Sequence, residues 1–118
     1  MQWNVELSRE VEKWYLGLSN FGSAEADVAL ERLRQRGNQL GMPHSRSLSK
    51  GLFELRFQCE GNAVRVTYIF DVRRRVVTLT QFKKQKNNEQ KEILRARKQQ
   101  KLVMLSRKGA IDHDENAN

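Results

Sequence analysis

Four cationic residues in the sequence have the types and spacing that suit a phosphodiester: Arg56, Arg65 and the pair Lys83 and Lys84. Guanidinium groups donate hydrogen bonds in a planar fork that fits phosphate oxygens, and fixed cations stabilise the charge that develops during attack on phosphorus. The reaction also needs a base and an acid. Histidine is the residue type whose unperturbed pKa suits this role, which makes His44 a candidate, and Lys84 would serve if neighbouring cations and partial burial lowered its pKa.

The two arginines lie on two predicted strands, 52–59 and 63–70, which a Glu-Gly pair separates. Apolar residues alternate with others along both strands, so residue parity assigns each side chain to a face. A two-residue turn brings the apolar faces together and sets Arg56 directly opposite Arg65. Like charges in that position destabilise a sheet, although Glu54 lies diagonal to Arg65 and offsets part of the repulsion. The pair indicates either an anion site or a salt-bridged exposed face.

A third predicted strand, 76–82, adds an aromatic ring to the same face. If the segment DVRR forms a four-residue turn, Arg65 faces Thr80, Phe82 emerges beside them, and the two lysines follow. An aromatic ring among cations suits a nucleotide, because stacking holds the base while the charges hold its phosphates. Packing of Phe82 beneath the last helix is the alternative. The candidate RNA-binding residues are Arg46, Arg73, Arg74, Phe82, Lys83 and Lys86.

The elements that position these residues predict an α+β fold. A short strand at 2–7 precedes two helices with Ser8 and Ser23 as N-caps, residues 41–51 form a loop, and a helix runs from Glu89 to about Leu105. The order β-α-α-β-β-β-α favours a small, mostly antiparallel sheet with helices packed on one face. We expect a single domain at 1–108, with a basic C-terminal helix, and a disordered acidic tail at 109–118.

The net charge of +8 lies in one part of the chain. Residues 1–72 hold equal numbers of basic and acidic side chains, residues 73–108 hold 13 basic against 2 acidic ones, and residues 109–118 add three acidic ones. A field so concentrated favours a polyanion such as RNA, through phosphate neutralisation and counterion release. An acidic protein surface fits it too, and a solvated basic helix without a partner is the third possibility.

The remaining composition narrows the class of protein. The single cysteine, Cys59, excludes an intramolecular disulfide, and no Cys/His cluster has zinc spacing. We interpret Cys59 as a buried, inert thiol. No apolar run is long enough to span a bilayer, and the first residues lack the pattern of a signal peptide. These features predict a cytoplasmic protein.

Three segments together carry a family resemblance: PHSRSLSKGLFELRF, VRVTYIF and VVTLTQFKK. Over about residues 1–98 the chain resembles the Gp49-like, HigB-type toxins of the RelE/ParE superfamily. The resemblance implies a RelE-like fold and a type II toxin that cleaves mRNA on the ribosome, by attack of the 2′-hydroxyl on the neighbouring phosphate. It implies no metal or organic cofactor, and a helix-turn-helix (HigA-type) antitoxin as partner. The family's functional positions map to Arg56, Arg65, Lys83 and Lys84. They also map to His44 and Arg46, but a loop residue of this kind is often only solvated, so the role of these two residues stays open.

Two other functions fit the same fold. One is a non-nuclease toxin that inhibits DNA gyrase, as in the ParE branch of the superfamily, and the other is a basic RNA-binding module without catalysis. Many RelE-type nucleases place a tyrosine or histidine shortly after the basic pair, whereas KKQKNNEQKE contains neither. The identity of the general acid and base is therefore left open.

Overall fold

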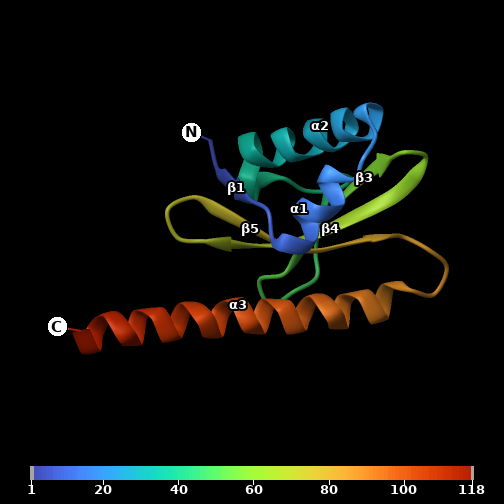
Figure 1. Ribbon diagram of the computed structural model, residues 1–118. Helices are drawn as coiled ribbons and strands as arrows, with labels where there is room; N and C mark the ends of the chain where they lie inside the picture. The colour runs from blue at the N-terminus through green and yellow to red at the C-terminus, as the bar shows by residue number, and fades with distance from the viewer. Residues whose placement is uncertain (1, 118) are drawn as a thin grey trace.

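The computed structural model describes the backbone of residues 2–117 and the side chains of residues 2–107. The chain forms an α+β arrangement, in which two α-helices follow the first strand, the other four strands come next, and a long helix comes last (Figure 1). The elements are β1 (Asn4–Glu6), α1 (Arg9–Leu16), α2 (Asn20–Arg36), the 3-10 helix η1 (Gly37–Gln39), β2 (Ser45–Ser47), β3 (Phe53–Cys59), β4 (Asn62–Asp71), β5 (Arg75–Lys83) and α3 (Glu89–Ala117).

The strands form one sheet in the order β1-β5-β4-β3-β2. The β1–β5 pair is parallel and the other three pairs are antiparallel, which confirms the predicted α+β class and the mostly antiparallel sheet. The short strand β2 lies inside the segment that the sequence predicts to be a loop. It pairs with β3 so that Arg46 stands opposite Glu54.

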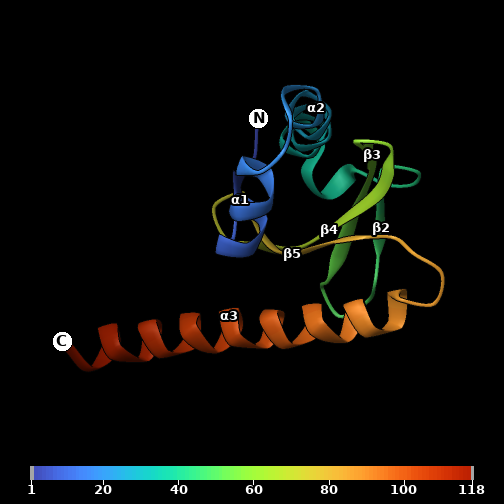
Figure 2. The same ribbon diagram turned by 45° about the vertical axis from the view of Figure 1, so that its right-hand side comes forward.

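The helices cover both faces of the sheet rather than one (Figure 2). Helices α1 and α2 pack Val11 and Leu33 against one face, which carries Leu55, Val66 and other apolar residues. The opposite face presents Leu52, Ile69 and Leu79, and α3 covers it with Ala96. The prediction of helices on one face is therefore wrong, because strand residues of both parities are apolar near the β4–β5 turn and both sides need a cover.

The N-cap prediction is confirmed for α1 and wrong for α2. The hydroxyl of Ser8 accepts a hydrogen bond from the backbone N–H of Val11 at 3.2 Å. For α2 the cap is Ser19, whose hydroxyl accepts from Gly22 N–H at 3.0 Å, and Ser23 lies inside the helix. The carboxylate of Glu60 accepts the Ser19 N–H at 2.8 Å, so a contact with the distant β3–β4 turn helps to fix this earlier start.

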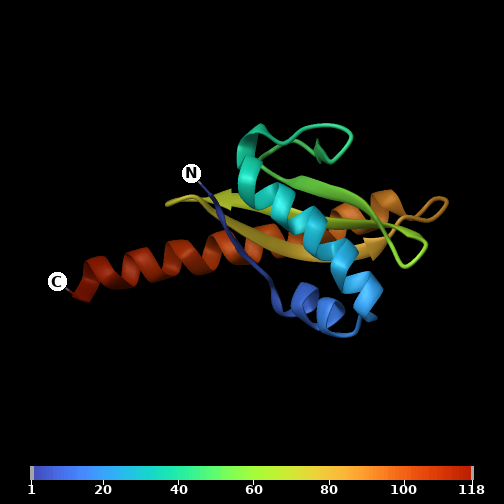
Figure 3. The same ribbon diagram turned by 90° about the horizontal axis from the view of Figure 1, so that it is seen from above.

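Helix α3 continues through Ala117, so the backbone of residues 109–117 is helical where the sequence predicts a disordered tail. No proline interrupts the segment, and Gly109 alone does not end a helix that has already formed. At about 1.5 Å per residue the helix is roughly 43 Å long, and it extends past the β4–β5 turn (Figure 3). None of the described helices is long and apolar enough to cross a membrane.

Side-chain contacts attach α3 to the rest of the molecule at three places. Near its start Arg95 binds the carboxylate of Glu10 in α1, with Nη1 to Oε1 at 2.6 Å. Two residues later the guanidinium of Arg97 donates to the carbonyl of Ser49, at 2.9 Å. Further along, Arg107 forms an ion pair of 2.7 Å with Asp71 at the end of β4. These contacts hold the helix across the sheet.

The β3–β4 hairpin has the predicted register. Its turn is the Glu60-Gly61 pair, Gly61 adopts a φ of 78°, and Arg56 stands directly opposite Arg65. Glu60 also has a positive φ, of 53°, as the primed hairpin turns require at both central positions. The like-charged pair is therefore a feature of the folded sheet.

The β4–β5 register differs from the prediction in two ways. The turn has three residues, 72–74, because Asp71 pairs with Arg75, and a bulge interrupts the ladder between Val66 and Tyr68. Beyond the bulge Arg65 pairs with Phe82 rather than with Thr80. The extra residue in β5 shifts residue parity, so Phe82 still shares a face with Arg65 while Lys83, opposite Val64, lies on the other face.

Candidate active site

Six charged residues gather on the α3-covered face of the sheet, near the β5–α3 loop. We call them the basic cluster. They come from β2, β3, β4, the residue after β5 and the first turn of α3, and they are Arg46, Glu54, Arg56, Arg65, Lys84 and Glu89. Strand pairing places Arg46 opposite Glu54 and Arg56 opposite Arg65, so the positions of four members follow from the sheet register.

Glu54 lies at the bottom of the basic cluster. Its side chain is fully buried, and its Oε1 atom lies 3.9 Å from Nε of Arg56 and 3.9 Å from Nε of Arg65. Neither carboxylate oxygen accepts a hydrogen bond from any residue that the structure describes. Burial raises the pKa of Glu54, and the charge of Glu89 raises it further, while the neighbouring arginines act in the opposite direction.

Arg65 is the most enclosed cation of the basic cluster, with a side chain 10% exposed. Its Nη1 donates to the carbonyl of Val64 at 3.1 Å, and its Nε has no hydrogen-bond partner among side chains 2–107 or the described backbone. Burial and the charge of Arg56 lower the pKa of Arg65, whereas the charge of Glu54 raises it. The guanidinium of Arg65 remains a cation at neutral pH, because arginine starts from a very high pKa.

Glu89 lies at the rim of the basic cluster, in the first turn of α3. Its Oε1 pairs with Nη1 of Arg46 at 3.3 Å and its Oε2 pairs with Nζ of Lys84 at 3.6 Å. Four cations therefore face two carboxylates, and two positive charges are left over. An anion that enters the basic cluster meets a positive field.

Two shallow clefts reach the basic cluster. One, of about 260 Å³, lies between Arg56, Arg65 and the Met42-Pro43 segment. The other, of about 340 Å³, lies between α2 and β3 and is lined by residues that include Arg32, His44 and Arg56. Arg56 borders both clefts, and its side chain is 25% exposed. It is therefore the arginine that a ligand in either cleft reaches first.

The fold brings His44 beside Arg56. The backbone carbonyl of His44 accepts a hydrogen bond from Arg56 N–H at 2.8 Å, which extends the β2–β3 pairing by one residue. The side chain is half-buried and lines the same cleft as Arg56. The sequence predicts a loop at His44, and in the structure that loop is joined to the site.

Phe82 lies next to the basic cluster, opposite Arg65, but its side chain is almost covered. Only 5% of its surface is exposed, and the neighbouring Thr80 is fully buried. The hydroxyls of Thr67 and Thr80 bond to each other at 2.5 Å beneath the site. The ring therefore offers little surface for stacking on a base, and its placement agrees better with the packing alternative.

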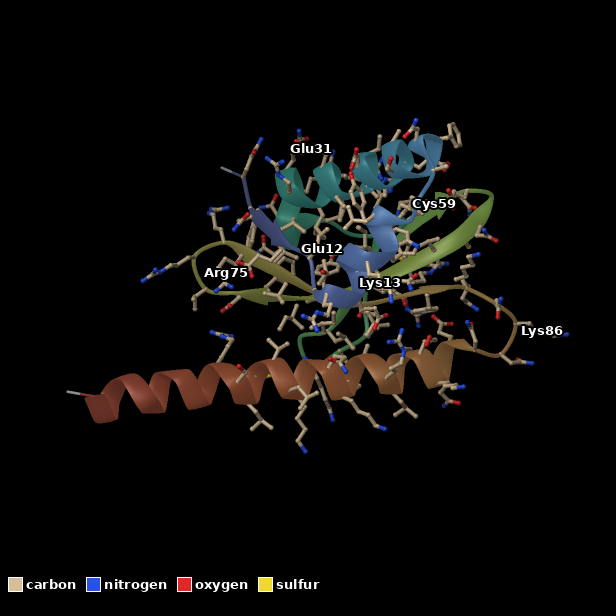
Figure 4. The ribbon with its side chains drawn as sticks, in the orientation of Figure 1. Glu12, Lys13, Glu31, Cys59, Arg75 and Lys86 are labelled. Atoms are coloured by element: carbon tan, nitrogen blue, oxygen red, sulfur yellow. The ribbon has the colours of Figure 1, made fainter. Side chains whose placement is uncertain are left out.

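Four other candidate RNA-binding residues lie away from the basic cluster. Lys83 is exposed on the opposite face of the sheet, and Lys86 projects from the β5–α3 loop (Figure 4). Arg73 and Arg74 occupy the β4–β5 turn, about 20 Å along the strands from Arg65 at roughly 3.3 Å per residue. The guanidinium of Arg74 lies over the ring of Trp3, 5.3 Å from its centroid.

Sequence reasoning missed the acidic half of the site. It treated Glu54 only as a diagonal neighbour of Arg65, and it did not consider Glu89 or Arg32. The parity that Glu54 shares with Arg56 was a usable signal. The position of Glu89, by contrast, depends on α3 crossing the polar face, which no local pattern reveals.

Among residues 2–107, no group of three histidine, cysteine, aspartate or glutamate side chains is arranged to hold a metal ion. A larger cleft, of about 720 Å³, lies at the far end of the sheet between Trp3, Arg36 and Arg74. Arginine and amide side chains dominate its lining, so it lacks the acid–base groups of the basic cluster.

Residues 13–101 match the family described as phage derived protein Gp49-like (DUF891). The chain belongs to the Gp49-like family. This is the family of the HigB/RelE-like toxins, and membership indicates a toxin of the toxin–antitoxin kind with an antitoxin as partner. A search of curated proteins finds no match. The matched span covers about three quarters of the chain and contains the whole basic cluster, whereas β1 lies outside it.

Proposed function

We propose that this Gp49-like protein is an endoribonuclease toxin that cleaves mRNA on the ribosome. The observation that carries the proposal is the basic cluster, in which Arg56 and Arg65 stand side by side at a cleft with an excess of positive charge. The gyrase-inhibitor alternative requires no phosphate site, and nothing in the basic cluster favours it. The proposed target places the protein in the cytoplasm.

The reaction would be an internal transesterification. The 2′-hydroxyl of one nucleotide loses its proton and attacks the adjacent phosphorus, the bond from phosphorus to the 5′-oxygen breaks, and that oxygen takes up a proton. The products are a 2′,3′-cyclic phosphate and a 5′-hydroxyl. Arg56 and Arg65 would bind the non-bridging oxygens, on which negative charge accumulates during the attack. No metal or organic cofactor is needed in this scheme.

His44 and Lys84 are the candidates for proton transfer. His44 lines the cleft beside Arg56, so its imidazole would take the 2′-hydroxyl proton from that side. Lys84 sits at the rim, where Glu89 now binds its ammonium group, and it would stabilise or protonate the leaving oxygen once RNA displaces Glu89. Arg46, also bound to Glu89, would hold a flanking phosphate.

The test is to map RNA ends on ribosome-bound transcripts after brief induction of the protein. We expect new ends with 2′,3′-cyclic phosphates and a block of translation that precedes any damage to DNA. Arg65→Ala and Lys84→Ala should each lower cleavage about 10²- to 10³-fold, as loss of a charge-stabilising donor does elsewhere. Arg73→Ala, at the remote β4–β5 turn, is the matched arginine control and should retain cleavage.

Three results would overturn the proposal. Full growth inhibition by both site variants would show that the basic cluster is not the active site. DNA damage before translation fails would favour the gyrase-inhibitor alternative. RNA binding without new ends would favour a non-catalytic RNA-binding module.

For the partner, we propose a helix-turn-helix (HigA-type) antitoxin that neutralises the toxin at the basic cluster. A carboxylate of the antitoxin would bind Arg56, the more exposed of the two paired arginines. Antitoxin binding should then compete with an RNA oligonucleotide, and charge reversal by Arg56→Glu should weaken both complexes. Unchanged antitoxin affinity in that variant would place the contact elsewhere.

A further inference from the structure

The carboxylate of Glu54 is an unusual group for the interior of a small domain. Its side chain has no exposed surface, and within the described part of the chain neither oxygen accepts a hydrogen bond. A buried carboxylate is costly unless it is paired and hydrogen-bonded, and such groups in native proteins are rare enough to need an explanation. Packing alone would be better served by an apolar residue of similar volume.

The position of Glu54 supplies that explanation. Its Oε1 lies 3.9 Å from Nε of Arg56 and also 3.9 Å from Nε of Arg65, the two residues that stand opposite each other in the sheet. One negative charge shared between two like charges offsets their repulsion. The carboxylate of Glu54 therefore attracts both guanidinium groups toward the same point.

The two carboxylates of the basic cluster differ in what RNA can do to them. Glu89 is 29% exposed at the rim, so a phosphate can displace it from Arg46 and Lys84. Glu54 is inaccessible beneath the arginines, so a bound phosphate lies above it and leaves it in place. Glu89 would therefore compete with RNA, whereas Glu54 would not.

We propose that Glu54 is a positioning residue, whose buried charge holds Arg56 and Arg65 side by side so that both contact one phosphate. This inference rests on the proposed nuclease function. Glu54 itself does not touch RNA. Because a negative charge under the site opposes RNA binding while it orients the arginines, its removal changes affinity and rate in opposite directions.

The experiment compares Glu54→Gln with Glu89→Gln, two isosteric removals of one charge from the same cluster. Affinity is measured at low salt with a non-cleavable 2′-O-methyl RNA oligonucleotide, and the cleavage rate with a ribosome-bound transcript. We expect Glu54→Gln to bind RNA several-fold more tightly and to cleave up to about 10²-fold more slowly, as misplaced catalytic groups do. Glu89→Gln should also bind more tightly, but it should cleave faster at subsaturating RNA.

Glu54→Asp provides a second variant, which keeps the charge and withdraws it by one methylene. We expect its RNA affinity to match the unsubstituted protein and its cleavage rate to fall. Each variant is assayed well below its own unfolding temperature. A parallel loss of stability, affinity and rate in both Glu54 variants, or failure of both to fold, would assign Glu54 a structural role and overturn the proposal.

NMR of the arginine side chains separates failure of this inference from failure of the nuclease proposal. We expect Glu54→Gln to shift the Nε–Hε signals of Arg56 and Arg65, and Glu89→Gln to leave them nearly unchanged. If the unsubstituted protein does not cleave RNA but these shifts appear, only the nuclease function fails. If it does cleave and Glu54→Gln neither shifts the signals nor slows cleavage, the positioning role fails.

Discussion

Glu54 should make the stability of the protein depend on pH in a direction opposite to that of most carboxylates. Burial raises its pKa, so the folded protein binds a proton at a pH where the unfolded chain has released it. Protonated Glu54 should therefore contribute fully to the free energy of unfolding at pH values below 4.5, the ordinary pKa of this side chain. That contribution is lost as the pH rises through the raised pKa of the folded protein.

Urea unfolding of the protein and of Glu54→Gln, from pH 4 upward, measures this contribution as a difference between the two curves. Glu10 acts in the opposite sense: burial tends to raise its pKa, but the bonds from Arg95 and the backbone of Gln81 outweigh burial and lower it. Its contribution is common to both proteins and cancels. Parallel curves would show that the pKa of Glu54 is the same in the folded and unfolded states.

At this scale the sequence predicted the cations better than the carboxylates. Arg56 and Arg65 meet as expected because hairpin parity and the Glu-Gly turn are local features. The burial of Glu54 was not predictable, because acidic residues at polar strand positions are usually exposed. Its burial follows from the cover that the arginines and the start of α3 provide.

For the elements, the attachment of α3 can be tested at its far end. Arg107 binds Asp71, whose side chain is 1% exposed and also holds Arg75 at 3.1 Å. Arg107→Ala should release the second half of α3 while the Asp71–Arg75 pair keeps the β4–β5 turn in place. The total stability should change by no more than about 1 kcal/mol, because the arginine is partly exposed.

Amide hydrogen exchange should detect this release as faster exchange in α3 near Arg107, with the strands unchanged. Lys101→Ala is a control on the same helix, since Lys101 is exposed and has no ion pair among the described residues. Equal protection of α3 in both variants would mean that Ala96 and Arg97 suffice to hold the helix.

Element boundaries were predictable where local chemistry sets them, and arrangement was not. The strands at 53–59, 62–71 and 75–83 lie within a residue or so of the predicted ranges, because alternation and turn residues mark their ends. The placement of α3 depends on Leu52, Ile69 and Leu79. The predicted register puts Leu52 and Ile69 on one face of the sheet and Leu79 on the other. Only the assembled sheet shows that they form a second apolar surface.

For the whole molecule, the charge imbalance predicts how binding responds to salt. Several lysines on α3 are exposed and have no ion pair among the described residues, namely Lys91, Lys98 and Lys101. If each neutralises one phosphate of single-stranded RNA, replacing all three by glutamine should reduce the slope of log affinity against log salt by about 2. Cleavage of RNA already bound to the ribosome should be retained.

The triple lysine variant tests the attraction of RNA, whereas Arg65→Ala tests catalysis. Arg65→Ala should lower the cleavage rate and barely alter the association rate. Ribosome sedimentation at several salt concentrations gives the slope. An unchanged slope in the triple variant would show that the net charge of +11 on residues 73–108 is solvated and does not bind RNA.

The bulge in the β4–β5 ladder has an evolutionary consequence. Beyond one surplus residue in β5, Phe82 stands opposite Arg65 and Lys84 lies within reach of Glu89. Deletion of one residue at the bulge would make the ladder continuous and keep the same partners beyond it, with Phe82 opposite Arg65. An in-frame deletion of one codon there should therefore leave the toxin active, and growth inhibition by such a variant is the measurement that checks it.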